Sequence, residues 1–96
     1  MEFKRENPSA RFSVPDKITV RQQLQYFSEA RSADRPVFER LWVGASLLIT
    51  DWECEIMPDY KISLDDISDP NVTDVLIWAG LAVMRHIDSL DNISKN

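Results

Sequence analysis

Hydrophobic residues recur at helical spacing in three separate stretches of the chain. The first follows Thr19, which with Gln22 three residues later has the spacing of a capping box and predicts the start of a helix. The second begins at Pro36, which suits a first helical turn because proline lacks an N–H that this turn leaves unpaired. The third opens with Asp69 as cap and Pro70 as first residue. The predicted apolar stripes are Val20, Leu24, Phe27 and Ala30, then Phe38, Leu41, Trp42, Ala45, Leu48, Ile49 and Trp52, then Val72, Val75, Leu76, Ala79, Val83, Ile87 and Leu90.

The N-terminal part lacks this periodicity. Residues 1–11 are polar and show no hydrophobic period, so we expect a flexible arm there. Phe12 and Val14 alternate with polar neighbours, which is typical of a short extended piece, and Pro15 prevents its continuation as a central strand. So short a piece cannot form a stable sheet alone, so we expect an arm packed on its own core or on a neighbouring copy in preference to a genuine sheet strand.

The segment from residue 54 to residue 69 has no long helical period and contains Pro58 as a breaker. We predict an irregular acidic crossover with one helical turn at the letters SLDD. It is either a partner-facing or mobile loop, or a crossover held to the core by Ile56, Tyr60, Ile62, Leu64 and Ile67. The predicted fold class is therefore all-α: residues 12–96 form a single small helical domain of three main helices behind a short extended N-terminal arm.

Both glycines of the chain lie inside predicted helices, Gly44 in the second and Gly80 in the third. Glycine costs a helix interior about 1 kcal/mol relative to alanine, so a side chain must be unfavourable at these positions. We expect the two helices to cross closely at Gly44 and Gly80; alternatively, one glycine marks the place where a partner helix docks.

The composition narrows the class of protein. With 44% hydrophobic and 28% charged residues, the chain has the make-up of a folded domain. The net charge is −5, and residues 51–74 hold eight acidic side chains against Lys61 alone, which argues against a nucleic-acid partner. The longest apolar run, from Val75 to Met84, is ten residues, well short of the roughly 20 that span a bilayer, so we expect no membrane partner.

The residues that usually carry chemistry are few. His86, the single histidine, follows the helical spacing of Val83 and is more typical of a boundary residue than of a general base. Cys54 has no second cysteine to pair with, and a reducing cytoplasm is its simplest location. The acidic cluster near Asp65 lacks the spacing and the glycine of a calcium-binding loop. We therefore expect no catalytic residue, no cofactor and no metal.

The class of function that remains after these exclusions is the binding of another polypeptide. The third helix carries hydrophobic residues on its flank as well as on its main stripe, so it is apolar over most of its circumference. Such a helix is either central to the fold or exposes a surface for a partner, and a hydrophobic client or a second copy would fit equally well. The candidate protein-binding residues are Phe12, Val14, Ile77, Trp78, Leu81 and Met84.

The stretches FSVPDKITVRQQLQYFSEAR and VLIWAGLAVMRHI, with the acidic middle and the terminus LDNISKN, resemble the tail assembly chaperones of long-tailed bacteriophages over residues 12–96. This resemblance implies an α-helical, non-enzymatic protein in the host cytoplasm that binds the hydrophobic tape measure protein and keeps it soluble. It also implies recruitment of the tail tube protein, self-association, and absence from the finished virion. Chaperones of this kind are often made in two lengths by ribosomal frameshifting, and this chain would be the short form.

A second interpretation uses the same apolar flank differently. A structural virion component, such as a head–tail connector or tail completion protein, would use it to assemble a ring. The two interpretations differ in one accessible property, because a chaperone is missing from purified particles and a connector is present in a fixed copy number.

Overall fold

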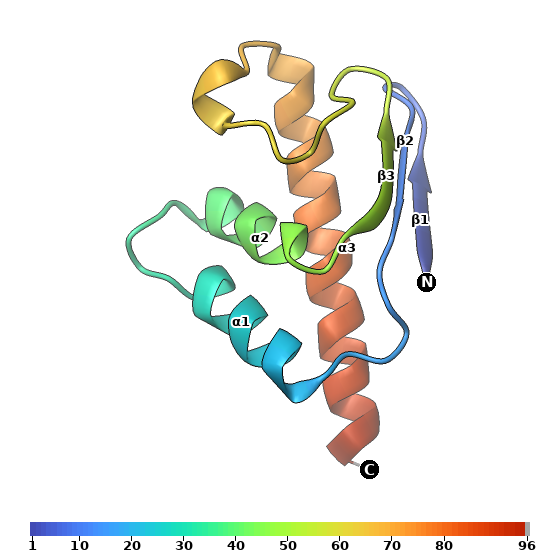
Figure 1. The fold of residues 1–96 in the computed structure, drawn as a ribbon, viewed down its shortest axis with the longest axis vertical. Coiled ribbons are helices and arrows are strands. Elements are labelled where there is room, and N and C mark those ends of the chain that lie inside the picture. The colour runs from blue at the N-terminus through green and yellow to red at the C-terminus, as the bar shows by residue number, and fades with distance from the viewer. Residues whose placement is uncertain (96) are drawn as a thin grey trace.

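The computed structural model describes residues 1–95, with side chains described as far as Leu90; Asn96, the last residue of the predicted domain, lies outside the described residues. Helix α3 (Pro70–Lys95) forms the long axis of the molecule, with helices α1 (Val20–Ala30) and α2 (Val37–Ser46) on one side (Figure 1). On the other side lies an antiparallel sheet of strands β1 (Glu2–Arg5), β2 (Ala10–Ser13) and β3 (Thr50–Cys54), in that order.

This sheet shows that the prediction of an all-α fold is wrong, because the chain forms an α+β domain. Residues 1–11, expected as a flexible arm, hold β1 and the start of β2, and Asn7 in the turn between them has a left-handed φ of 56°, which asparagine tolerates. Phe3 faces inward and stacks on Phe12 with ring centroids 5.1 Å apart. β1 and β2 have four residues each, too few for a periodicity that the sequence would reveal.

Strand β3 replaces the predicted end of the second helix. Helix α2 stops at Ser46, whose hydroxyl donates a hydrogen bond to the Val43 carbonyl at 2.7 Å. Trp52, expected on the stripe of that helix, lies instead in β3, and the preceding Asp51 has a φ of 52°. The pairing of β3 with β2, which are distant in the sequence, outweighs the local preference for helix because it satisfies the backbone groups of both strands.

The start of α1 is as predicted. The Thr19 hydroxyl accepts a hydrogen bond from the Gln22 backbone N–H at 3.1 Å, and the Gln22 side-chain oxygen accepts one from the Thr19 N–H at 2.9 Å. This reciprocal pair is the capping box that the spacing of the two residues indicates.

The apolar stripe predicted for α1 is covered only in its second half, where Ala30 is buried and Phe27 packs partly buried against the core. Val20 and Leu24 are 73% and 65% exposed, whereas Tyr26 and Ala30 are buried. Helix α1 packs on α2 through Tyr26 and Ala30, which meet Gly44, so this contact and not the hydrophobic period decides which face is covered.

The two glycines mark two different helix contacts. A β-carbon on Gly80 would lie 3.2 Å from Cβ of Leu41, so α3 approaches α2 closely there. A β-carbon on Gly44 would lie 3.2 Å from Cβ of Ala30, so that glycine faces α1. Close helix crossing is therefore present at both glycines, but they do not face each other.

The crossover to α3 contains one turn of 3₁₀ helix, η1 (Leu64–Asp66), capped by the Ser63 hydroxyl, which accepts from the Asp65 N–H at 3.3 Å. The Tyr60 hydroxyl donates to the Ile49 carbonyl at 3.3 Å. Four of the five expected anchors pack partly buried against the core, which favours the held crossover over a mobile loop; they are Ile56, Tyr60, Leu64 and Ile67.

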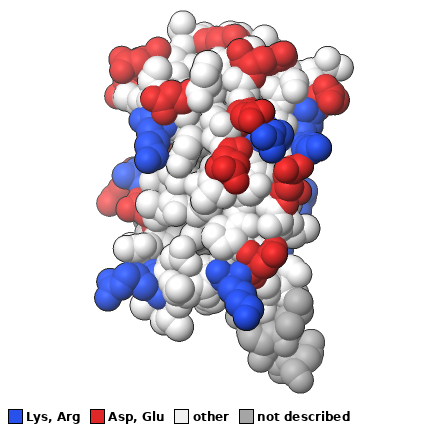
Figure 2. All heavy atoms as spheres, turned by 45° about the vertical axis from the view of Figure 1, so that its right-hand side comes forward, with Lys and Arg blue, Asp and Glu red and all other residues white. Residues whose placement is uncertain are grey.

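The charge is distributed unevenly along the long axis. Acidic side chains gather at the end where α3 begins and where the crossover lies (Figure 2). Within residues 51–74 the one basic side chain is Lys61, which lies over the ring of Tyr60 at 5.7 Å. None of the helices, over the residues that the structure describes, combines the length and hydrophobicity needed to cross a membrane.

Candidate protein-binding groove

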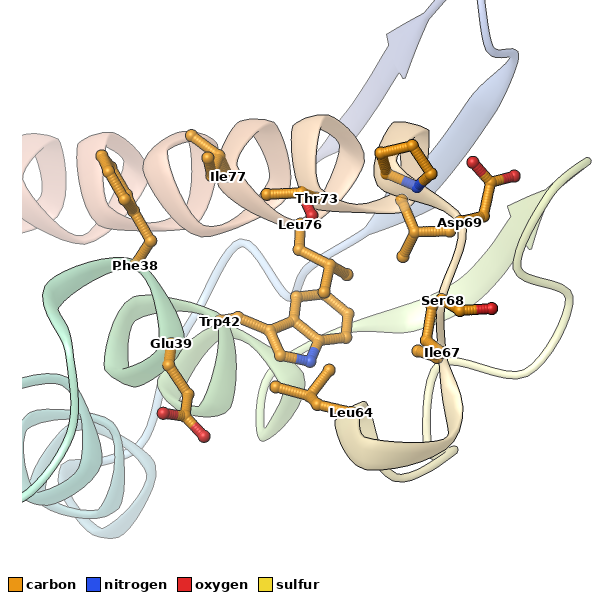
Figure 3. A pocket seen from close by; sticks show the side chains of 12 residues that line it. Phe38, Glu39, Trp42, Leu64, Ile67, Ser68, Asp69, Thr73, Leu76 and Ile77 are labelled. Atoms are coloured by element: carbon orange, nitrogen blue, oxygen red, sulfur yellow. The ribbon is translucent and has the colours of Figure 1, made fainter.

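An apolar groove opens between the start of α2, the turn η1 and the start of α3, with a cavity volume of about 270 Å³. The indole of Trp42 lies between Leu64 and Leu76, and Phe38 and Ile77 lie together at one end (Figure 3). The hydrophobic lining of the groove comes from all three elements: Phe38, Trp42, Leu64, Ile67, Val72, Leu76 and Ile77.

Phe38 is the most exposed aromatic residue in the groove lining. It lies in the first turn of α2 and is 51% exposed, although the period of the second stripe predicts a core residue. A half-exposed phenylalanine beside an open apolar cavity has large hydrophobic area left to bury. A partner that covers Phe38 therefore gains binding free energy from the hydrophobic effect.

Trp42 contributes a polar group to the same groove. Its side chain is buried, with 4% of the residue exposed. The indole nitrogen of Trp52 donates to the Met57 carbonyl at 2.7 Å, whereas nothing within residues 1–90 accepts a hydrogen bond from the Trp42 indole. The indole nitrogen of Trp42 is not sealed from solvent. It is not among the buried side-chain atoms that lack a hydrogen-bond partner, which in the described residues are Arg5 Nε and the Tyr26 hydroxyl oxygen. Its N–H is thus free to bind an acceptor that enters the groove.

Three of the predicted binding residues continue the groove along the outer face of α3. Ile77, Leu81 and Met84 are spaced by four and three residues, so they share one face of the helix, and each is partly exposed. Ile77 also lines the groove itself. This part of the predicted surface is open to a partner.

Trp78 turns toward the sheet. Its ring lies edge-on to Phe12 with centroids 5.2 Å apart, and the guanidinium of Arg5 lies 5.7 Å from its ring centroid. The sheet therefore covers much of this residue, and only its remaining edge can contribute to a binding surface.

Phe12 and Val14 are core residues. They are 0% and 2% exposed, and the Val14 N–H donates to the Met1 carbonyl at 2.9 Å. Of the two positions expected for this segment, on its own core or on a neighbouring copy, the structure has the first. These two residues offer no surface to a partner.

Carboxylates surround the apolar lining. Glu39 and Asp69 line the groove, and a second shallow depression on the other side of Ile67 has Asp59 and Asp66 in its lining. None of these four forms an ion pair with another side chain in the described part of the chain. Glu39 lies in the first turn of α2, and the Asp69 carboxylate accepts a hydrogen bond from the Asn71 N–H at 2.9 Å. The groove therefore combines an apolar floor with carboxylates that have no side-chain counterion in the described part of the chain.

The residues considered for chemistry lie apart from one another. His86 is buried on α3 with Nε2 3.3 Å from the Pro15 carbonyl oxygen, and Cys54 is buried at the end of β3. Among the described residues, no group of three or more histidine, cysteine or acidic side chains could hold a metal ion. The arrangement offers apolar contacts for a polypeptide.

The sequence alone did not single out Phe38, Trp42 or Leu64 as site residues, because each fits a buried helical stripe or an anchored loop. The one available signal was the mixture of isolated hydrophobic residues and aspartates in residues 54–69.

Comparison with protein-family models, with curated proteins and with solved structures gave no significant match.

Proposed function

We propose that this protein is a non-enzymatic tail assembly chaperone that binds apolar helical segments of the tape measure protein and keeps them in solution. The observation that carries the proposal is the open apolar groove with Phe38 half exposed at its end. A helix laid into a groove of this kind contacts it through residues spaced by three, four and seven positions. The phage and the client follow from the sequence resemblance, and the groove supports the mode of binding.

The outer face of α3 extends the client surface. Ile77 belongs to both the groove and this face, so one client helix can contact Phe38 and then Leu81 and Met84 without a break. The acidic exterior supports the same function, because a net charge of −5 keeps a complex with a hydrophobic client soluble.

Self-association and recruitment of the tail tube protein are part of the proposal. Helix α1 contributes no residue to the groove lining. Its exposed Val20 and Leu24 supply a separate apolar surface for contact with another copy. Two surfaces on different elements allow client binding and self-association at the same time.

Co-expression with an apolar segment of the tape measure protein tests the proposal. The wild-type protein is expected to raise the soluble fraction of the segment, and Leu81→Glu or Met84→Glu to abolish that effect while helix content by circular dichroism stays nearly intact. Ser89→Glu, at an exposed position of the same helix, is the matched control and should keep full activity.

Two results would contradict the proposal. One is an unchanged soluble fraction with the wild-type protein; the other is a full effect in the Leu81→Glu and Met84→Glu variants. Mass spectrometry of purified particles adds an independent check, because a chaperone should be missing from them.

A further inference from the structure

From the charge around the groove we infer the chemistry of the segment that it binds: a basic amphipathic helix, with lysine or arginine flanking its apolar face. This inference rests on the proposed function and specifies the client.

The charge at the groove favours a basic partner. Glu39 and Asp69 line the groove, and Asp66 lines the adjoining depression. No cation from the described residues pairs with these carboxylates. Lys61, the one base in residues 51–74, is placed over Tyr60. A helix that brings lysine or arginine to this edge compensates the charge, whereas an acidic helix adds repulsion.

The geometry of the groove favours a helix as its occupant. The groove and the adjoining depression share Ile67, Ser68, Asp69 and Val72, so the two apolar hollows are neighbours along one short piece of backbone. A single amphipathic helix can place one apolar side chain in each hollow, and its flanks then lie near the carboxylates of the two linings. Long basic side chains suit these flanks because their methylene stems cover apolar surface while their charged ends reach the carboxylates.

Trp42 offers a hydrogen-bond donor to an occupant of the groove. Its indole lies in the groove lining, its N–H has no acceptor among the described residues and is not sealed from solvent, and the nitrogen lies on the side of the ring toward Leu64 (Figure 3). An entering helix can pair with this donor through a side-chain or terminal carbonyl oxygen. A purely apolar occupant, such as a lipid chain, would displace water from the donor without replacing its hydrogen bond.

Three synthetic helical peptides of equal length test the inference. The first has a leucine stripe flanked by lysine, the second has the same stripe flanked by glutamate, and the third has lysine at the same positions but serine in place of leucine. Titration calorimetry is carried out at low and high salt. We expect the leucine–lysine peptide to bind at least tenfold more tightly than either of the others, with a preference that shrinks as salt rises.

Variants of the protein identify the carboxylates that cause the preference for the lysine-flanked peptide. Glu39→Gln combined with Asp66→Asn should reduce the lysine preference severalfold, while Asp88→Asn, an exposed carboxylate farther along α3, should leave it unchanged. All three changes are at partly or fully exposed positions, and thermal unfolding verifies that the variants are folded.

The outcomes separate this inference from the proposed function. If the lysine-flanked and glutamate-flanked peptides bind equally, the groove binds apolar helices and the inference on charge falls. If none of the peptides binds, the result contradicts both the inference on charge and the proposed function. If the leucine-free lysine peptide binds as well as the first, the attraction is unspecific and the inference falls. A change of oligomeric state in the Glu39→Gln and Asp66→Asn variant would assign the groove to contact between copies and would also overturn it.

Discussion

Gly80 of α3 lies directly against Leu41 of α2: a β-carbon at Gly80 would be 3.2 Å from Cβ of Leu41 and 3.3 Å from its carbonyl carbon. This contact sets the distance between the two helices that form the groove. Glycine suits this position because the neighbouring atoms belong to the backbone and to the first carbon of a side chain, which cannot rotate away from an added β-carbon.

The first prediction concerns this contact. Gly80→Ala gains about 1 kcal/mol of helix propensity but overpacks the crossing at a cost of about 1–3 kcal/mol, so the free energy of unfolding should fall by about 1 kcal/mol. Gly44→Ala is the matched comparison, and its effect should be smaller because the three atoms nearest to its added β-carbon belong to side chains, whereas two of those near Gly80 are backbone atoms. Urea titration of both variants measures the difference. A Gly80→Ala protein more stable than the wild type would contradict the close crossing.

The cap of α1 gives a second prediction. Thr19→Ala removes the hydroxyl that accepts from the Gln22 N–H, so the protein should lose about 1 kcal/mol of stability. Ser28→Ala, at an exposed position inside the same helix, should be neutral or slightly stabilising because alanine has the higher helix propensity. Thermal unfolding of the two variants distinguishes them, and equal melting temperatures would show that the capping box does not stabilise the fold.

Tyr26 gives a prediction about alkaline pH. Burial raises the pKa of its hydroxyl to about 12, with a smaller contribution from Asp88, and the hydroxyl has no hydrogen-bond partner in the described residues. The unfolded state releases this proton near its ordinary pKa, so between the two pKa values the folded state holds more protons and stability falls as pH rises.

The size of this effect is about 2 kcal/mol, lost progressively from about pH 10 to pH 12. Tyr26→Phe should lack this component and should be no less stable than the wild type at neutral pH, because an unpaired buried hydroxyl is removed. Urea titrations across this pH range compare the two proteins. Identical alkaline profiles would mean that the Tyr26 hydroxyl is ionised in the folded state as easily as in the unfolded state.

Self-association gives a fourth prediction. Leu24→Glu places a charge in the exposed apolar surface of α1, so any oligomer formed through that surface should dissociate while the monomer remains folded. Arg21→Glu, an exposed charged position of the same helix, is the control for charge alone. Light scattering measures the mass of each variant. An oligomer that survives Leu24→Glu would place the contact between copies elsewhere.

The helices could be predicted from the sequence because their signals are local. The box formed by Thr19 and Gln22 gave the start of α1, and the spacing of Val72, Val75 and Val83 identified the buried face of α3. The sheet could not be predicted, because β1 is short and mostly polar and because Trp52 fits a helical period as well as it fits a strand. Strand pairing between distant segments is a tertiary choice that local spacing does not contain.

The site was predicted in part for the same reason. Ile77, Leu81 and Met84 lie on the partly exposed face of α3 that their spacing indicated, whereas Phe12 and Val14 belong to the core. The groove depends on the position of η1 next to Trp42 of α2 and the start of α3. No single stretch of sequence defines this arrangement of three elements.

The central claim, that the groove binds an apolar helical segment, can be tested most directly by NMR with a ¹⁵N-labelled protein and a soluble amphipathic peptide. The indole N–H of Trp42 should shift strongly as peptide is added, together with the amides of Phe38 and Ile77. The indole N–H of Trp52, which is bonded to the Met57 carbonyl, should stay in place. Binding that leaves the Trp42 indole unmoved, or that shifts only residues outside the groove, would contradict the account.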